Sequence, residues 1–211
     1  MGHSEYILDG VAIPSVTQVL NVISKPQLYA WYAKHGWAEC ERIKKTSGEL
    51  GQRLHDAIEA YLQGEPYDLQ GRELEMLRLF QDWKTQTDFR PVELERKVIS
   101  KRHKFHGTFD ALGTFGDSTE LFMLDWKTSS KISDEYALQL SAYAAAYEEE
   151  TGIPVINGGV VRIDKKPDAK KPFEVKTFNG LPAYFEVFRD ALSLWNFTNR
   201  KDKWATKKEA A

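Results

Sequence analysis

The sequence predicts an α/β or α+β protein with a helical region at its N-terminus. Apolar residues recur at helical spacing through the first ninety residues, and the spacing then changes to the alternation typical of strands. A long helical pattern, two more strand-like segments and a last helical pattern follow. We therefore expect helices, three strands, a helix, two strands and a final helix, in that order.

Four helices are expected in the N-terminal region. The first begins at Ser15, where Gln18 completes a capping-box pattern. The second restarts at Pro26 in the segment PQLYAWYAKHGW. The third covers residues 47–64 and the fourth residues 70–87, with apolar stripes formed by Leu50, Leu54, Ile58, Tyr61 and Leu62 and by Leu74, Leu77, Phe80 and Trp83.

The rest of the chain combines strands with helices. The first three strands are expected over residues 92–100, 104–115 and 120–128, the last two joined as a hairpin by a turn-like Gly-Asp-Ser segment. The order is completed by a helix over residues 134–152, strands over residues 154–163 and 172–178, and a helix from about Leu181 into a lysine-rich tail.

Composition limits the class of protein. The chain has 211 residues, of which 42% are apolar and 28% charged, as in ordinary soluble globular proteins. No apolar run approaches the length of a membrane span, and the N-terminus lacks a signal-peptide pattern, so we expect no membrane association. The single cysteine, Cys40, excludes a disulfide framework or a cysteine-based metal cluster within the chain, which fits the reducing cytoplasm.

The charge pattern is less informative. The net charge of −2 excludes no class of partner, because one basic face can be hidden in the mean. Basic residues cluster at 97–104, 165–171 and 200–208. Taken alone, such clusters are more often solvated faces than binding tracks.

The segment FMLDWKTSS contains the first candidate chemistry. Strand side chains alternate between faces, so Asp125 and Lys127 are expected on one side and Trp126 on the other. Asp110 lies fifteen residues upstream, and a hairpin brings both acids to the same end of the paired strands. Two carboxylates suit Mg²⁺ or Mn²⁺, and the lysine would orient a water that attacks phosphorus. The alternative is an exposed ion pair of little energetic value.

Four motifs together resemble the PD-(D/E)XK nuclease superfamily, in particular its RecB-like exonuclease branch. GTFDAL (residues 107–112) and MLDWKTS resemble its paired strand motifs, GQRLHDAIE its G-x-x-x-H-x-x-x-E helix, and QLSAY its Q-x-x-x-Y helix. The opening PSVTQVL is similar to a segment of the mitochondrial genome-maintenance exonuclease and its phage relatives. This resemblance implies a restriction-endonuclease-like core, with a mixed central sheet flanked by helices and an N-terminal helical region.

The resemblance also implies a domain organisation. We expect one nuclease domain over residues 1–211. It would consist of a mainly helical region (1–90), an α/β catalytic core (91–178) and a C-terminal helix with a basic tail (179–211).

The resemblance implies the metal ligands as well. Asp110 and Asp125 would bind the metal, with the backbone carbonyl of Trp126 as another ligand and His55 as a further one. Taken alone, His55 would more often be a core or boundary residue. Two weaker candidates complete the set: Glu59, which a surface contact one helical turn from His55 explains equally well, and Glu95, whose face in the strand is ambiguous.

Three residues are implied in catalysis beside the acids. Lys127 would position and activate the attacking water. Gln139 and Tyr143 would support Lys127 or the DNA. A buried Gln139 needs hydrogen-bond partners, and the alternative is a boundary position whose amide binds loop carbonyls.

Several residues are candidates for binding DNA. Ser15 and Thr17 would offer a helix N-terminus to a phosphate, although helix capping explains them equally well. Lys101, Arg102 and Lys104 belong to a basic segment that would follow the DNA backbone. Three aromatic residues have the chemistry to stack on bases, although core packing is the favoured expectation for most of them: Trp31, Tyr32 and Trp37.

We therefore expect a Mg²⁺- or Mn²⁺-dependent DNA exonuclease that prefers single strands or ends. The resemblance implies recombination, repair or DNA processing in a bacterial or phage-infected cytoplasm. A single cysteine excludes the iron–sulfur cluster of some relatives, and no Walker motif occurs. The nuclease would work alone or with a recombination or single-strand-binding protein. The alternatives are a structure- or sequence-directed endonuclease, a non-catalytic DNA-binding recombination accessory, and a structural protein with a buried charge network.

Overall fold

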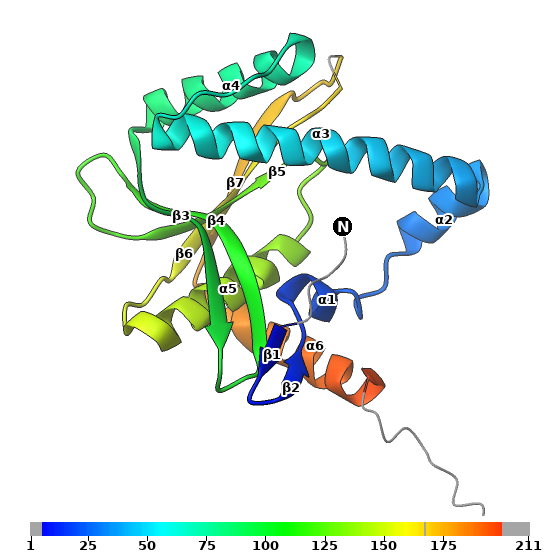
Figure 1. The fold of residues 1–211 in the computed structure, drawn as a ribbon, viewed down its shortest axis with the longest axis vertical. Coiled ribbons are helices and arrows are strands. Elements are labelled where there is room, and N and C mark those ends of the chain that lie inside the picture. Colours follow the sequence, from blue (N-terminus) through cyan, green and yellow to red (C-terminus); the bar gives the residue numbers. More distant parts are fainter. Residues whose placement is uncertain (1–5, 167, 200–211) are drawn as a thin grey trace, which may run out of the picture.

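A mixed five-stranded sheet lies between two groups of helices in the computed structural model, which describes residues 6–166 and 168–199 (Figure 1). The strands are β1 (Tyr6–Leu8), β2 (Val11–Ile13), β3 (Phe89–Ser100), β4 (Phe105–Phe115), β5 (Phe122–Lys127), β6 (Asn157–Ile163) and β7 (Phe173–Asn179). The helices are α1 (Val16–Leu20), α2 (Pro26–His35), α3 (Trp37–Gln63), α4 (Gly71–Thr87), α5 (Glu135–Thr151) and α6 (Leu181–Asn199). The basic cluster at 200–208 falls outside the described residues.

The sheet has the order β3-β4-β5-β6-β7. Only β5 and β6 are parallel, and α5 forms the crossover between them, as parallel neighbours require. Residues of α1, α5 and α6 form the core on one face of the sheet, and residues of α3 and α4 form the core on the other. The predicted α+β fold with a mixed sheet flanked by helices is confirmed.

The predicted hairpin is also confirmed, because β4 and β5 pair antiparallel. The capping box is present at Ser15, whose side chain accepts a hydrogen bond from the backbone N–H of Gln18. None of the helices in the described ranges is long and apolar enough to cross a bilayer.

Two expectations about the N-terminal region are wrong. Helix α3 begins at Trp37, ten residues before the predicted start, because its first half buries Cys40 alone and so has no apolar stripe to mark it in the sequence. A short β1–β2 hairpin precedes the helices and was not expected. Its turn contains Asp9 and Gly10, a pair typical of tight hairpins.

Candidate active site

Three neighbouring strands each place a carboxylate at the same level of the sheet. By the register of the adjacent residue pairs, Glu95 on β3 lies opposite Asp110 on β4. The β4–β5 ladder ends at the pair of Ala111 and Leu124. Continuing its register by one residue brings Asp110 level with Asp125. The sheet therefore carries a row of three acids across β3, β4 and β5.

The strands are irregular at this row. Phe109 and Leu112 both pack in the core on the α5 face, although residues three apart in a strand normally face opposite sides. Ala111 packs on the face of α3 and α4. The alternation of β4 therefore slips at Asp110, which allows its carboxylate to contact groups from more than one element.

Helix α3 adds an imidazole to the acids. Ligand atoms of His55, Glu95 and Asp110 all lie within 4.8 Å of one another. His55 Nδ1 is 3.6 Å from Asp110 Oδ2. The same oxygen accepts a hydrogen bond of 2.6 Å from the backbone N–H of Trp126, so the strand end of β5 fixes the Asp110 carboxylate.

Glu95 thus lies inside the cluster, which resolves the ambiguity of its face. Glu59 lies one turn beyond His55, and its carboxylate accepts a hydrogen bond of 3.0 Å from Gln63. It is outside the group of three potential ligands found in the described residues.

Asp125 and Lys127 form a partly buried ion pair on the other side of Asp110. Lys127 Nζ donates to Asp125 Oδ1 at 2.6 Å and lies 2.5 Å from Oδ2. The second approach lacks hydrogen-bond geometry, so Oδ2 is a buried oxygen with no hydrogen-bond partner in the described residues. The ring of Tyr136 lies 5.1 Å from Nζ. The pair is therefore not the exposed surface salt bridge of the alternative interpretation.

Gln139 is hydrogen-bonded to one member of this pair and to Tyr143. Its amide Nε2 lies 3.1 Å from Asp125 Oδ1 and 3.0 Å from the Tyr143 hydroxyl oxygen, and its side chain is buried. The alternative of a boundary residue bonded to loop carbonyls is wrong. Gln139 contacts the carboxylate of Asp125 rather than the ammonium of Lys127, and Tyr143 is linked to that carboxylate through Gln139.

A steric constraint explains the glycine of GTFDAL. A Cβ added to Gly107 would lie 2.3 Å from Cε1 of the Tyr143 ring, far closer than atoms can approach. Gly107 therefore allows Tyr143 to lie against β4, where its hydroxyl meets Gln139. Burial raises the pKa of Tyr143, so the hydroxyl is neutral.

The cluster carries an excess of negative charge. Burial raises the pKa of Glu95 to about 8, and the carboxylates of Asp110 and Glu59 add to the effect. Burial also raises the pKa of Asp125 to about 6, against the attraction of Lys127. Burial alone would lower the pKa of Lys127, but Asp125 and Asp110 raise it overall, so the ammonium is charged.

These residues fit a divalent cation. Carboxylates are the ligands that Mg²⁺ and Mn²⁺ prefer, and an imidazole is compatible with Mn²⁺. Among the described residues Asp125 Oδ2 meets only the Lys127 ammonium, and Asp110 and Glu59 add negative charge around Glu95, so one ammonium faces several carboxylates.

A cavity of about 250 Å³ adjoins Lys127. Thr17 and Gln139 line it, together with Asn21 and Lys25, which the sequence did not point to. Their position depends on the packing of α1 against α5, which local patterns do not give. Ser15 instead caps α1.

The basic segment with Lys101, Arg102 and Lys104 lies away from the acids. Lys104 lies in the turn before β4 and six residues before Asp110, or about 20 Å at the rise of a strand. The backbone N–H of Arg102 donates to Glu149 at 2.9 Å, so this turn is attached to the C-terminal end of α5, ten residues beyond Gln139.

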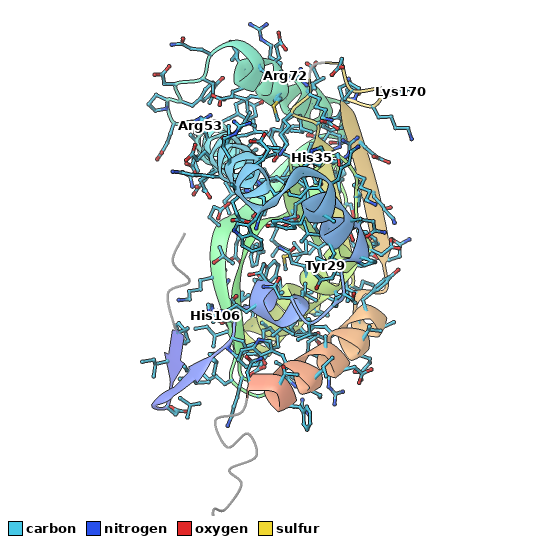
Figure 2. All side chains as sticks on the ribbon, turned by 90° about the vertical axis from the view of Figure 1, so that its right-hand side faces the viewer. Tyr29, His35, Arg53, Arg72, His106 and Lys170 are labelled. Atoms are coloured by element: carbon cyan, nitrogen blue, oxygen red, sulfur yellow. The ribbon has the colours of Figure 1, made fainter. Side chains whose placement is uncertain are left out.

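The basic segment at 165–171 lies at the other end of the sheet. Lys127 pairs with Arg162 in the β5–β6 register, and this segment begins three residues later. Arg72 on α4 donates to the backbone carbonyls of residues 164–166. Figure 2 shows Lys170 and Arg72 near the α4 end of the molecule and His106, beside the β3–β4 turn, near the opposite end.

The aromatic residues of α2 and α3 correct another expectation. Trp37 is 72% exposed, and helix α2 contains no buried residue. Tyr32 stacks on Trp37 with ring centroids 4.9 Å apart, and Trp31 packs beside Tyr32. These rings pack on one another between two helices rather than in the core.

Known proteins supply an independent comparison. An alkaline exonuclease from Laribacter hongkongensis is 16% identical, with 88% of this chain and 87% of that chain covered and a TM-score of 0.46. Its complex with dAMP gives 12% identity, the same coverage and a TM-score of 0.37. The structure titled SSO0001 is 16% identical, with 92% and 78% covered and a TM-score of 0.45. The search of curated proteins gave no match.

The family comparison is decisive, because it covers more than half of the chain. The family model described as PD-(D/E)XK nuclease superfamily matches residues 63–207, a range that contains Glu95, Asp110, Asp125 and Lys127. The chain belongs to the PD-(D/E)XK nuclease superfamily.

Proposed function

We propose that this chain is a single-domain, Mg²⁺- or Mn²⁺-dependent DNA exonuclease that acts on single strands or on DNA ends. The observation that carries the proposal is the convergence of His55, Glu95 and Asp110 on one point, beside the ion pair of Asp125 and Lys127. No isolated pair of these residues would require hydrolytic chemistry. The set combines metal ligands with a charged group that can act on water and phosphate.

His55, Glu95 and Asp110 would hold the cation, together with Asp125 and the Trp126 carbonyl. A bound divalent ion supplies charge neutralisation at the phosphate and lowers the pKa of water. The carboxylates of Glu95 and Asp125, whose pKa values burial raises, lose their protons when they act as ligands.

Lys127 would orient the attacking water and stabilise negative charge as it develops on the phosphate. Asp125 fixes the Lys127 ammonium by an ion pair at 2.5 to 2.6 Å. Gln139 in turn fixes Asp125, and the neutral Tyr143 hydroxyl meets the Gln139 amide. Each group in this series of hydrogen bonds orients the next, so Lys127 keeps one position beside the acids.

The preference for single strands or ends is supported by the resemblance of GQRLHDAIE and QLSAY to the RecB-like exonuclease branch. The exposed Lys166 and Lys170 lie at the sheet end that carries Lys127 and would contact the DNA backbone. A role in recombination or repair in bacterial or phage-infected cytoplasm, alone or with a recombination or single-strand-binding protein, completes the proposal.

The test is hydrolysis of end-labelled single- and double-stranded DNA with Mg²⁺, Mn²⁺ or EDTA. Wild type is expected to degrade DNA only with metal, and Lys127→Ala to be inactive under all conditions. Lys101→Ala is the matched control, since this lysine lies at the opposite end of the sheet, and it should retain activity. Activity of Lys127→Ala in EDTA would contradict the mechanism.

Closed circular single-stranded DNA separates the alternatives. An end-dependent exonuclease leaves the circle intact, whereas an endonuclease cuts it. Tight DNA binding without cleavage of any substrate would instead indicate a non-catalytic accessory.

A further inference from the structure

The backbone of Glu95 adopts a strained conformation inside a strand. Its φ angle is 45°, in the left-handed region that non-glycine residues avoid at a cost of about 1–2 kcal/mol. The other described non-glycine residues with positive φ are at turns or at a helix end: Asp9, Asp88 and Lys104. Strain of this kind persists only where surrounding contacts hold it.

Contacts on both sides of Glu95 lead to one residue of α5. The Tyr147 hydroxyl donates to Glu93 Oε1 at 2.7 Å, and Arg96 Nη1 donates to Glu93 Oε2 at 2.5 Å. The Arg96 guanidinium also lies 4.9 Å from the centroid of the Tyr147 ring and forms an ion pair with Glu150 at 3.1 Å.

This arrangement determines the direction of the Glu95 side chain. Glu93 and Arg96 both contact Tyr147, although residues three apart in a regular strand face opposite sides. The alternation of β3 must therefore slip between them. The residue displaced by the slip is Glu95, and its carboxylate lies within 4.8 Å of ligand atoms of His55 and Asp110.

We propose that Tyr147 is a positioning residue for the metal site. Through Glu93 and Arg96 it holds the strained backbone that directs the Glu95 carboxylate at the cation. The inference rests on the proposed function, because it requires Glu95 to be a ligand. It adds a residue of α5 that touches neither the metal nor the DNA.

The test is Tyr147→Phe, measured by calorimetric titration of the full chain with Mn²⁺ in the absence of DNA. The substitution keeps the ring, which packs near Phe109, and removes only the hydroxyl. We expect the Mn²⁺ dissociation constant to rise about tenfold, the lower end of the range for groups that orient ligands. Cleavage should recover at saturating Mn²⁺, which a general loss of structure would prevent.

Two further measurements test whether Tyr147 affects Mn²⁺ binding through Glu95. In a Glu95→Ala background, Tyr147→Phe should produce no additional change in Mn²⁺ affinity. Tyr184→Phe, a half-buried tyrosine of α6 that packs on Phe178, is the matched control and should bind Mn²⁺ like wild type. If Tyr147→Phe does not fold, Glu93→Gln removes the Arg96 ion pair and should likewise weaken Mn²⁺ binding.

The outcomes distinguish the two proposals. Loss of affinity in Glu95→Ala with wild-type affinity in a folded Tyr147→Phe or Glu93→Gln would overturn only the role of Tyr147. Equal affinity of wild type and Glu95→Ala would remove Glu95 from the site and overturn the inference with it. No Mn²⁺ binding by wild type would overturn the proposed function and this inference together.

Discussion

Two ion pairs with the same spacing end the two parallel strands of the sheet. Asp125 and Lys127 lie at the end of β5, and Arg162 and Asp164 lie at the end of β6. Lys127 pairs with Arg162 in the register, so the two pairs are neighbours. Both combine a cation and a carboxylate two residues apart in a largely buried place.

Their hydrogen bonding separates them. Arg162 is 2% exposed and donates to Asp164, to Glu174 and to the backbone carbonyls of Ser129 and Lys171. Lys127 has a single carboxylate partner, lines a cavity and leaves one oxygen of Asp125 without a hydrogen bond. The satisfied pair joins loops, whereas the incompletely satisfied pair has capacity left for a ligand.

The largest expected effect is on catalysis at the pair of Asp125 and Lys127, the β5 pair. Lys127→Met should lower the single-turnover rate of DNA cleavage by about 10²–10⁴-fold, the range for a group that assists proton transfer. The free energy of unfolding should change by less than about 2 kcal/mol, because burial already raises the pKa of Asp125 to about 6 and its carboxyl can bind a proton. Loss of folding with no specific loss of rate would contradict the comparison.

The pair of Arg162 and Asp164, the β6 pair, should show the opposite behaviour. Arg162→Met removes one partner of a buried pair and should cost about 3–5 kcal/mol of unfolding free energy, measured by urea denaturation. Cleavage per folded molecule should stay within about tenfold of wild type, since Arg162 contacts no candidate ligand. A variant as stable as wild type but inactive would reverse the roles assigned to the two pairs.

Gly107→Ala tests how closely Tyr143 must approach the β5 pair. The added methyl collides with the Tyr143 ring and should destabilise the fold by about 1–3 kcal/mol, with a fall in cleavage as the ring moves from Gln139. Gly48→Ala is the matched control: nothing lies within 4 Å of its added Cβ in α3, and it should stabilise by about 0.5–1 kcal/mol. Equal effects of the two substitutions would contradict the steric argument.

The smallest effect concerns pH and the acids beside the β5 pair. Glu95 has a folded-state pKa of about 8, above its unfolded value of about 4.3. The folded state therefore binds more protons between these values, and the metal-free protein should lose stability as pH rises through this window. Urea denaturation in EDTA at pH 6 and pH 8.5 should show this loss, and Glu95→Gln should reduce it. An unchanged pH dependence would place the Glu95 carboxyl outside the charge cluster.

Local patterns were sufficient to predict much of the fold and site. Asp110 and Asp125 are joined by a short hairpin, so the distance between them followed from strand alternation and a turn. Gln139 lies on a regular helix that follows β5 directly. These relations involve near neighbours in the sequence, where periodicity is informative.

The remaining features depend on contacts between distant segments. The position of Glu95 required a slip in β3 that α5 holds, and alternation alone gave an ambiguous face. Arg162 was part of an apolar strand pattern, and nothing local indicated its four partners. Residues 101–104 and 165–171 are similarly basic in the sequence. The pairing of the strands shows that they lie at opposite ends of the sheet.

The central claim is that the acids around Asp110 bind a divalent cation. The direct measurement is calorimetric titration of wild type and Asp110→Asn with Mn²⁺, since asparagine keeps an acceptor for the Trp126 N–H but loses the charge. We predict binding by wild type and a loss of more than about 100-fold in the variant, beyond the 10–100-fold typical of groups that only orient ligands. Equal Mn²⁺ affinity of the two proteins would contradict the account.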